Sequence, residues 1–138
     1  MANGFYEHGM KNFARGSVLW LASGGSNIRT ALVDTADYAV NLATHDFLDD
    51  VAVAAREETS ANMTLIDAVA DGIVDANDVT FTGTTGDTCE GILVYRFVTN
   101  DADSLPLFWW DSASGLPVTL GGDVTVQWDN GANKIAKI

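Results

Sequence analysis

The sequence predicts an all-β fold, a single-domain β-sandwich or barrel with a short N-terminal helical arm. The first observation is period-two patterning in residues 115–138, where Val124, Val126 and Trp128 alternate with polar residues. Because successive side chains of a strand point to opposite faces, this pattern gives one apolar and one wet face. The second is a turn signal about every 8–12 residues, which is typical of sandwiches and barrels with short strands. The third is the length of 138 residues with a mean hydropathy of +0.09, which fits one globular domain.

Residues 1–27 are expected to form an N-terminal arm and loop, ahead of a β body that spans residues 28–138. Apolar side chains recur at helical spacing in residues 6–14, which predicts one or two turns of helix ended by Gly16. Basic residues set this segment apart from an acidic body. We therefore expect residues 1–17 to pack on a neighbouring molecule instead of their own core.

The β body is expected to consist of about eight to ten short strands joined by turns. The strands expected before the C-terminal segment cover residues 28–33, 63–69, 73–81, 91–98 and 105–110, with a short strand or buried segment at 18–22. Residues 91–98 are almost entirely apolar, as expected for a central strand covered on both faces. Residues 45–55 begin with a single helical turn, and their second half fits either a helix or a strand. Residues 115–138 predict three strands joined by tight turns at Gly121-Gly122 and Asn130-Gly131.

Charge is unevenly distributed along the chain, whose formal net charge is −12. Residues 30–133 hold 18 of the 19 acidic residues but only two of the seven basic ones. The other basic residues lie near the termini: Lys11, Arg15, Arg29, Lys134 and Lys137. An acidic body repels phosphate, which argues against nucleic acid and against anionic membranes as partners. The basic ends are suited to an acidic partner, and the acidic surface alone is equally suited to maintaining solubility.

Transmembrane and secretory segments are not expected. No apolar run approaches the ~18–20 residues of a membrane-spanning helix. The first nine residues include Glu7 and lack a cationic region before a long apolar stretch, so they do not resemble a signal peptide.

Residues with reactive or metal-binding side chains do not form a recognisable site. Cys89 is the only cysteine, which excludes an internal disulfide, and its acidic neighbours favour a small strand residue over a nucleophile. Three groups of charged residues are better explained by turns and wet surfaces than by calcium binding or acid-base chemistry: Asp71 with Asp75, Asn77 and Asp78; His45 with Asp46, Asp49 and Asp50; and Glu57-Glu58. We therefore expect no enzyme activity, no metal and no cofactor.

The aromatic run in residues 108–110 is the sharpest candidate for binding. In a strand, Trp109 and Trp110 point to opposite faces, so one fills the core and the other faces solvent, a second layer or a partner. Burial of both indoles between two sheets, a subunit interface and a sugar-stacking platform all fit this pattern, and the interface is preferred over the sugar. Together with the amphipathic N-terminal segment, the expected interface residues are Met10, Lys11, Phe13, Arg15, Phe108, Trp109 and Trp110.

Three ordered segments carry a family resemblance. They are IRTALVDTADYAVNLATHDFLDDV at residues 28–51, DGIVDANDVTFTGTTGDTCEGILVY at 71–95 and SLPLFWWDSASGLPVTLGGDVTVQWDNGANKI at 104–135. Together these segments resemble a widespread family of small tailed-bacteriophage virion proteins, usually described as structural or head-decoration proteins. The sequence departs from the pattern of that family at residues 63–67, and the side chains of Trp109 and Trp110 are larger than that pattern predicts.

The resemblance implies a non-enzymatic structural protein of a phage virion. Its expected role is a capsid decoration or cement protein, made in the host cytoplasm and bound over joints of the major capsid protein. A homo-oligomer, most simply a trimer, would match the three-fold symmetry of such joints. The alternatives are a neck, tail or fibre-associated virion protein and a host-glycan-binding module.

Overall fold

The computed structural model of the chain describes residues 3–67, 72–132 and 134–138. Its strands are β1 (Gly4–Phe5), β2 (Ile28–Val33), β3 (Arg56–Thr59), β4 (Leu65–Ile66), β5 (Ile73–Ala76), β6 (Val79–Phe81), β7 (Gly91–Arg96), β8 (Leu105–Trp110), β9 (Val124–Val126) and β10 (Ala136–Lys137). Helix α1 covers Glu7–Ala14, and two 3-10 turns, η1 and η2, cover Leu48–Asp50 and Val53–Ala55. The predicted all-β domain with one short N-terminal helix is confirmed.

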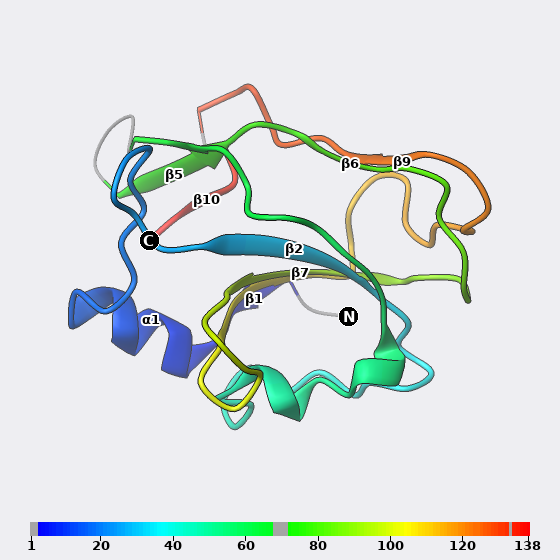
Figure 1. Cartoon of the computed structure of the whole chain (residues 1–138), viewed down its shortest axis with the longest axis horizontal. Helices are drawn as coiled ribbons and strands as arrows, with labels where there is room; N and C mark the ends of the chain where they lie inside the picture. The colour runs from blue at the N-terminus through cyan, green and yellow to red at the C-terminus, as the bar shows by residue number, and fades with distance from the viewer. Residues whose placement is uncertain (1–2, 68–71, 133) are drawn as a thin grey trace.

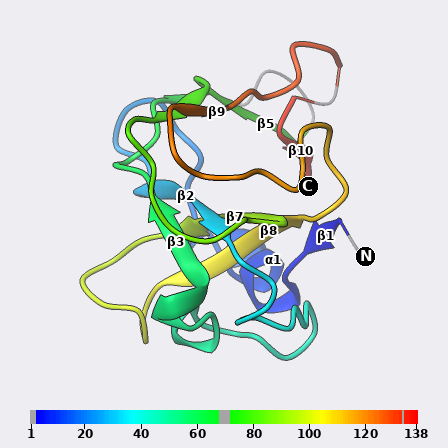
Figure 2. The same ribbon diagram turned by 90° about the vertical axis from the view of Figure 1, so that its right-hand side faces the viewer.

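The strands form antiparallel sheets in two layers (Figures 1 and 2). The main sheet has the order β1-β8-β7-β2-β3, and the second layer holds the sheets β10-β5-β4 and β6-β9. This arrangement is consistent with the predicted sandwich. Strands β2 and β7 pair in one continuous register from Ile28↔Arg96 to Val33↔Gly91. Between β7 and β8 the register shifts, so that Leu107 is the extra residue of a bulge.

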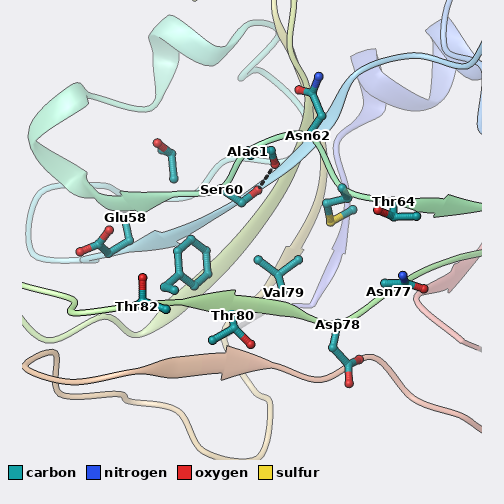
Figure 3. A pocket seen from close by; sticks show the side chains of 13 residues that line it. Glu58, Ser60, Ala61, Asn62, Thr64, Asn77, Asp78, Val79, Thr80 and Thr82 are labelled. Atoms are coloured by element: carbon teal, nitrogen blue, oxygen red, sulfur yellow. Dashed lines mark hydrogen bonds between the residues drawn. The ribbon is translucent and has the colours of Figure 1, made fainter.

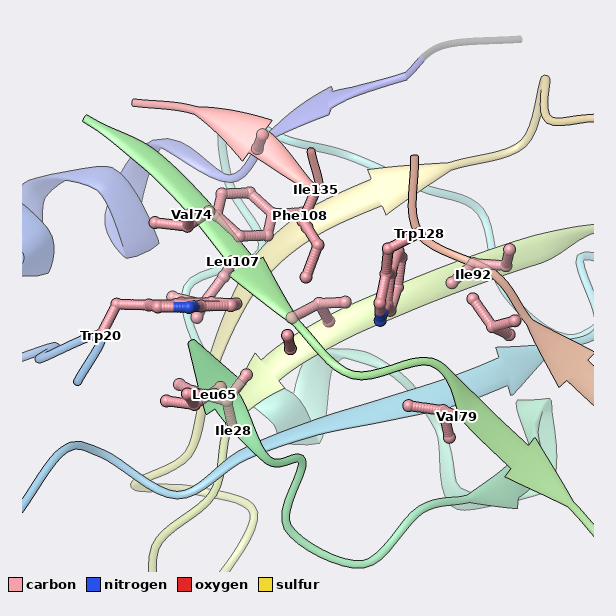
Figure 4. Close-up of a cluster of buried hydrophobic side chains, with 14 of the residues drawn as sticks. Trp20, Ile28, Leu65, Val74, Val79, Ile92, Leu107, Phe108, Trp128 and Ile135 are labelled. Carbon is pink, nitrogen blue, oxygen red and sulfur yellow. The ribbon is translucent and has the colours of Figure 1, made fainter. Parts of the chain in front are cut away.

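The main sheet is buried on both faces. One face packs against the second layer in a large apolar cluster that includes Ile92 and Val94 of β7 (Figure 4). The other face packs under residues 34–55 in a second cluster that includes Leu93 and Trp109. Alternate side chains of one strand therefore enter two different cores. This two-sided burial explains why residues 91–96 are almost continuously apolar.

The N-terminal segment is part of this core, so the prediction that residues 1–17 pack away from it is wrong for the described residues from Asn3 onward. Strand β1 pairs with β8, and the buried Tyr6 donates its backbone N–H to Leu107 at 3.0 Å. The hydroxyls of Tyr6 and Tyr38 are 2.8 Å apart. The basic residues of this segment predict a separate arm. In the structure, helix α1 packs the face that carries Gly9 against β8, and Lys11 remains exposed to solvent.

The C-terminal segment differs from the predicted run of three strands. Strand β9 pairs with β6 and β10 pairs with β5, so neighbouring strands in sequence join different sheets. Between β8 and β9, only Val118 makes a β-bridge, to Cys89. Gly121 has the expected positive φ of 139°, whereas Gly131 does not and its turn is closed by the Asp129 carboxylate. Pairing partners depend on residues distant in sequence, which a local pattern does not encode.

The structure also shows the conformation of two regions for which the sequence allowed alternatives. Residues 18–22 do not form a strand and are only partly buried, with Val18 and Trp20 inside and Leu19 and Leu21 exposed. The ambiguous second half of residues 45–55 contains the 3-10 turn η2, which is neither of the two expected states.

Close packing at Gly91 generates the first prediction. A Cβ atom at this residue would overlap the ring of Trp109, whose side chain is fully buried. We expect Gly91→Ala to lower the free energy of unfolding by about 1–3 kcal/mol through overpacking. Gly122→Ala is the matched control, since its Cβ meets nothing within 4 Å, and it should stay within about 0.5 kcal/mol of wild type. Urea unfolding measures both, and equal stabilities would contradict the packing described.

The correction at the N-terminus generates the second prediction. Tyr6 is fully buried, whereas its neighbour Phe5 is 40% exposed. Tyr6→Ala should therefore cost about 3–5 kcal/mol, the usual loss for a large buried aromatic. Phe5→Ala should cost less than Tyr6→Ala, since a large part of Phe5 is already exposed to solvent in the folded protein. Thermal unfolding of both variants checks this, and a stable Tyr6→Ala protein would restore the separate-arm model.

Candidate functional site

An apolar groove lies where α1, β1 and the C-terminal strand β10 meet. Its main hollow has a volume of about 470 Å³ and is lined by Phe5, Met10, Phe13, Ala14 and Ile138. An adjoining hollow of about 250 Å³ shares Phe5 and is lined also by Asn3, Gly4, Trp110, Ile135 and Ala136. We call the two hollows together the edge groove. Phe5 and Ile138 are 40% and 44% exposed, so large apolar side chains face solvent here.

Phe108 supports the edge groove from below. This fully buried ring contacts Phe5 edge-on at a centroid distance of 5.5 Å and stacks with Phe13 at 6.1 Å. It also contacts Trp110 at 5.8 Å, and Trp110 in turn contacts Trp128 at 5.6 Å. The aromatic rings connect the groove to the core between the two layers, which fixes the shape of its floor.

The structure brings most of the predicted interface residues together in this groove. Met10 and Phe13 line the main hollow, Trp110 lines the adjoining one, and Phe108 lies beneath them. Trp109 is on the opposite face of β8, in the second core cluster, where its Nε1 donates to Asp111 at 3.0 Å. The expectation that Trp109 and Trp110 point to opposite faces is confirmed. Trp109 itself is core and not interface.

Charged residues of both signs lie on the elements that form the edge groove. Glu7 and Lys11 are exposed on α1, Arg15 directly follows this helix, and Lys137 is exposed on β10. Among the described residues, none of the three cations forms an ion pair. Apolar lining with a charged border is the surface pattern of a protein contact.

The edge groove also lies at the open side of the two layers. Strand β1 is the last strand of the main sheet, and β10 is the last strand of the three-stranded sheet (Figure 2). Sequence reasoning missed Phe5 and Ile138 as groove residues. Ile138 joins the groove only through the pairing of β10 with β5, for which the sequence holds no local signal.

A second, polar groove of about 500 Å³ separates β3 from β6 (Figure 3). Its walls are formed by residues 58–64 and 77–82, rich in Ser, Thr and Asn side chains. It contains Glu58 and Asp78 but neither lysine nor arginine. Nothing in its lining assembles a nucleophile with a base.

The Asp-rich cluster of residues 71–78 has structural roles where it is described. Asp75 is buried, and one of its carboxylate oxygens accepts the N–H of Ala76 while the other lies 3.9 Å from Nζ of Lys134. Asp78 accepts the backbone N–H of Trp128 at 2.9 Å. Asp71 lies outside the described residues. Asp75 belongs to strand β5 and Asp78 lies between β5 and β6, and their contacts connect this region with the chain after β9.

The group around His45 is divided between different partners. His45 Nδ1 lies 2.8 Å from the Tyr38 hydroxyl, and Asp46 lies 3.7 Å from His8. Asp50 accepts the backbone N–H of Asp46 at 2.8 Å, which closes the turn before η1. Asp49 is exposed. The four side chains therefore do not converge on one point.

A cluster that sequence reasoning missed joins Asp34, Glu57 and Asp87, whose carboxylate oxygens lie within 4.8 Å of one another. Asp34 follows β2, Glu57 belongs to β3 and Asp87 lies in the loop before β7, so only the fold brings them together. Cys89 is fully buried beside them. Its setting is acidic and apolar, the opposite of the cationic environment that activates a thiol.

No protein-family model matches the chain. No curated protein matches its sequence. Within the described ranges of the chain, no helix is long and apolar enough to span a membrane.

The environment of Cys89 generates the third prediction. Burial, followed by the nearby carboxylates of Glu57, Glu90, Asp34 and Glu58, raises the pKa of the thiol from 9.0 to about 12. The unfolded chain loses this proton near pH 9 and the folded chain only near pH 12. Between these values the folded state binds more protons, so stability falls as pH rises.

We therefore expect Cys89→Ser to flatten the decline of the free energy of unfolding between pH 9 and pH 12. The slope that remains should come from Tyr6, Tyr38 and Tyr95, because burial raises the pKa of all three hydroxyls above the ordinary value of 10.0. Urea titrations across this range measure the two slopes. The native thiol should also resist alkylation at neutral pH, and rapid alkylation of the folded protein would contradict the buried position.

Proposed function

We propose that this chain is a non-enzymatic structural protein of a tailed-phage virion, which decorates the capsid and cements the joints between major capsid protein subunits. The phage assignment is supported by the resemblance of three ordered segments in residues 28–135. The observation that carries a contact function is the edge groove, because it exposes the large apolar side chains of Phe5 and Ile138 to solvent. Such a surface gains stability when a neighbouring protein covers it.

The fold is suited to this task. A decoration protein binds the assembled shell better than it binds free subunits, and so stabilises the shell by mass action. Binding of this kind requires a surface that is already formed. The aromatic contacts of Phe108 hold the groove floor in place, so little ordering free energy is lost on association.

The titratable groups of the described residues favour contact over catalysis. Asp34, Glu57 and Asp87 bring together carboxylates only, and the buried Cys89 thiol has a raised pKa. A nucleophile requires a base or a cationic setting nearby. A host-glycan role is less well supported by the edge groove, since sugar sites combine aromatic faces with several hydrogen-bonding groups, and this lining is almost entirely apolar.

The fourth prediction is the abundance of the protein in purified virions. If it decorates the capsid, quantitative gels should give a copy number comparable with that of the major capsid protein. Particles that lack it should release DNA at a lower temperature, and added protein should restore the wild-type value. A copy number that is a small fraction of the capsid protein would assign it to the neck or tail. Absence from virions would overturn the proposal, and specific binding on a glycan array would favour the attachment role.

A further inference from the structure

The polar groove lies along a strand edge that has no partner. Strand β6 pairs with β9 in a two-stranded sheet, and among the described residues it pairs with no other strand. All of β6 lines the groove, whereas no residue of β9 does, so the groove follows the edge of β6 that faces away from β9. Because the backbone groups of a strand alternate between its two edges, some N–H and C=O groups of β6 lack a strand partner on this side.

The opposite wall of the groove, residues 58–64, leaves this edge open (Figure 3). Only the last two residues of β3 belong to this wall. Beyond them, Ser60 and Met63 donate their backbone N–H groups to the carbonyls of Thr30 at 2.8 Å and Ile28 at 2.7 Å. This wall is therefore held on the main sheet, and its backbone is turned toward β2 instead of β6.

The two walls meet at the ends of the groove. At one end Asn77 donates its backbone N–H to the carbonyl of Thr64 at 2.9 Å, and at the other Thr85 donates its N–H to the Glu58 carboxylate at 3.1 Å. Between these contacts, no backbone hydrogen bond joins the walls in the described part of the chain. The wall at residues 77–82 extends for about 20 Å at about 3.3 Å per residue. The groove thus has the length of a short strand.

The lining indicates the chemistry of the occupant. The carboxylates of Glu58 and Asp78 have no lysine or arginine beside them in the lining, which favours a cationic occupant and opposes phosphate. The ring of Phe81 is 5% exposed, so it offers no face on which a sugar can stack. A second copy of β6 would bring another Asp78 to the same short edge, where like charges oppose strand pairing. A basic segment in extended conformation fits all three conditions.

We propose that the polar groove receives an extended, basic segment of another protein, which pairs with the free edge of β6 as the third strand of the β6–β9 sheet. In strand addition of this kind, main-chain hydrogen bonds supply affinity and alternate side chains supply specificity. One set of alternate side chains would face the buried Val79 and Phe81, and the other would face solvent near Asp78. The partner segment therefore alternates apolar residues with lysine or arginine.

This inference does not rest on the virion role proposed above. The edge groove lies at β1, whereas the polar groove begins at β3, the opposite edge of the main sheet. The two contacts use different residues, so each can fail in an experiment without the other.

The fifth prediction uses acetylated and amidated peptides of the form Thr-Lys-X-Lys-X-Lys-Thr, in which X is valine, isoleucine, threonine or tyrosine. At least one of them should bind the intact protein in isothermal titration calorimetry, and the same peptides with glutamate in place of lysine should not bind. Amide hydrogen exchange should slow within β6 on binding, because a backbone N–H that faces the groove gains an acceptor. Exchange in α1, at the other side of the main sheet, should not change.

Backbone methylation separates strand addition from binding through side chains alone. Successive N–H groups of a strand point to opposite edges, so methylating the nitrogens of the two X residues blocks one edge of the peptide. Methylating those of the first two lysines blocks the other edge. One of these two peptides should bind about tenfold more weakly than the parent, because it loses its hydrogen bonds to β6. The other is the matched control and should stay within about threefold of the parent.

Substitutions in the groove locate the site. Ala61 is exposed in the lining, whereas Ala102 is exposed in the loop before β8, outside the lining. Ala61→Arg should weaken binding of the lysine peptides about fivefold or more, since it adds bulk and a like charge, and Ala102→Arg should leave it within about twofold. Asp78→Asn should weaken binding about two- to fivefold, the range of an exposed ion pair. This variant keeps the oxygen that accepts the backbone N–H of Trp128.

Three results would overturn the inference. They are the absence of binding by every lysine peptide up to millimolar concentration, an affinity that neither methylation changes, and equal affinities of Ala61→Arg and Ala102→Arg. Circular dichroism of each variant verifies folding. A protein that decorates heads but binds none of the peptides would refute strand addition and leave the proposed function intact.

Discussion

Burial of both faces of the β7–β8 pair is the constraint on which the rest of the structure depends. Alternate side chains of these strands enter two separate cores, so each face of the main sheet needs its own cover. The second layer of strands covers one face and residues 34–55 cover the other. The close approach of the Trp109 ring to Gly91 shows how little space remains between them. Both covers lie over the faces of the main sheet, and its terminal strands β1 and β3 are left as the open edges.

The open edge at β1 is formed by elements from the two ends of the described chain. Strand β1 and helix α1 bring Phe5, Met10 and Phe13 to this edge, and β10 brings Ile138 from the other end of the sequence. The basic residues near the termini do not gather into one patch, however. Arg29 lies over the Phe97 ring and Lys134 lies 3.9 Å from Asp75, whereas Lys11 and Lys137 are exposed. The edge groove itself depends on the pairing of β1 with β8 and of β10 with β5.

Sequence patterns predicted those features that depend on neighbouring residues. The bounds of β2 and β8 agree with the expected strands at 28–33 and 105–110. The expected interface residues Met10, Phe13 and Trp110 also converge on one groove. Features set by distant contacts were not predictable. The packing of α1 on β8, the partners of β9 and β10 and the meeting of Asp34, Glu57 and Asp87 all join residues far apart in sequence.

The carboxylates near the β3 edge show the same dependence on distant contacts. Asp34, Glu57 and Asp87 lie within 4.8 Å of one another, and Asp34 is buried. Asp34 also has a local role, because its carboxylate accepts the backbone N–H of Ala36 at 2.7 Å and so closes the turn after β2. Among the described residues, no lysine or arginine forms an ion pair with these three acids. The fold therefore gathers negative charge at this edge, which would attract a cationic surface and repel an acidic one.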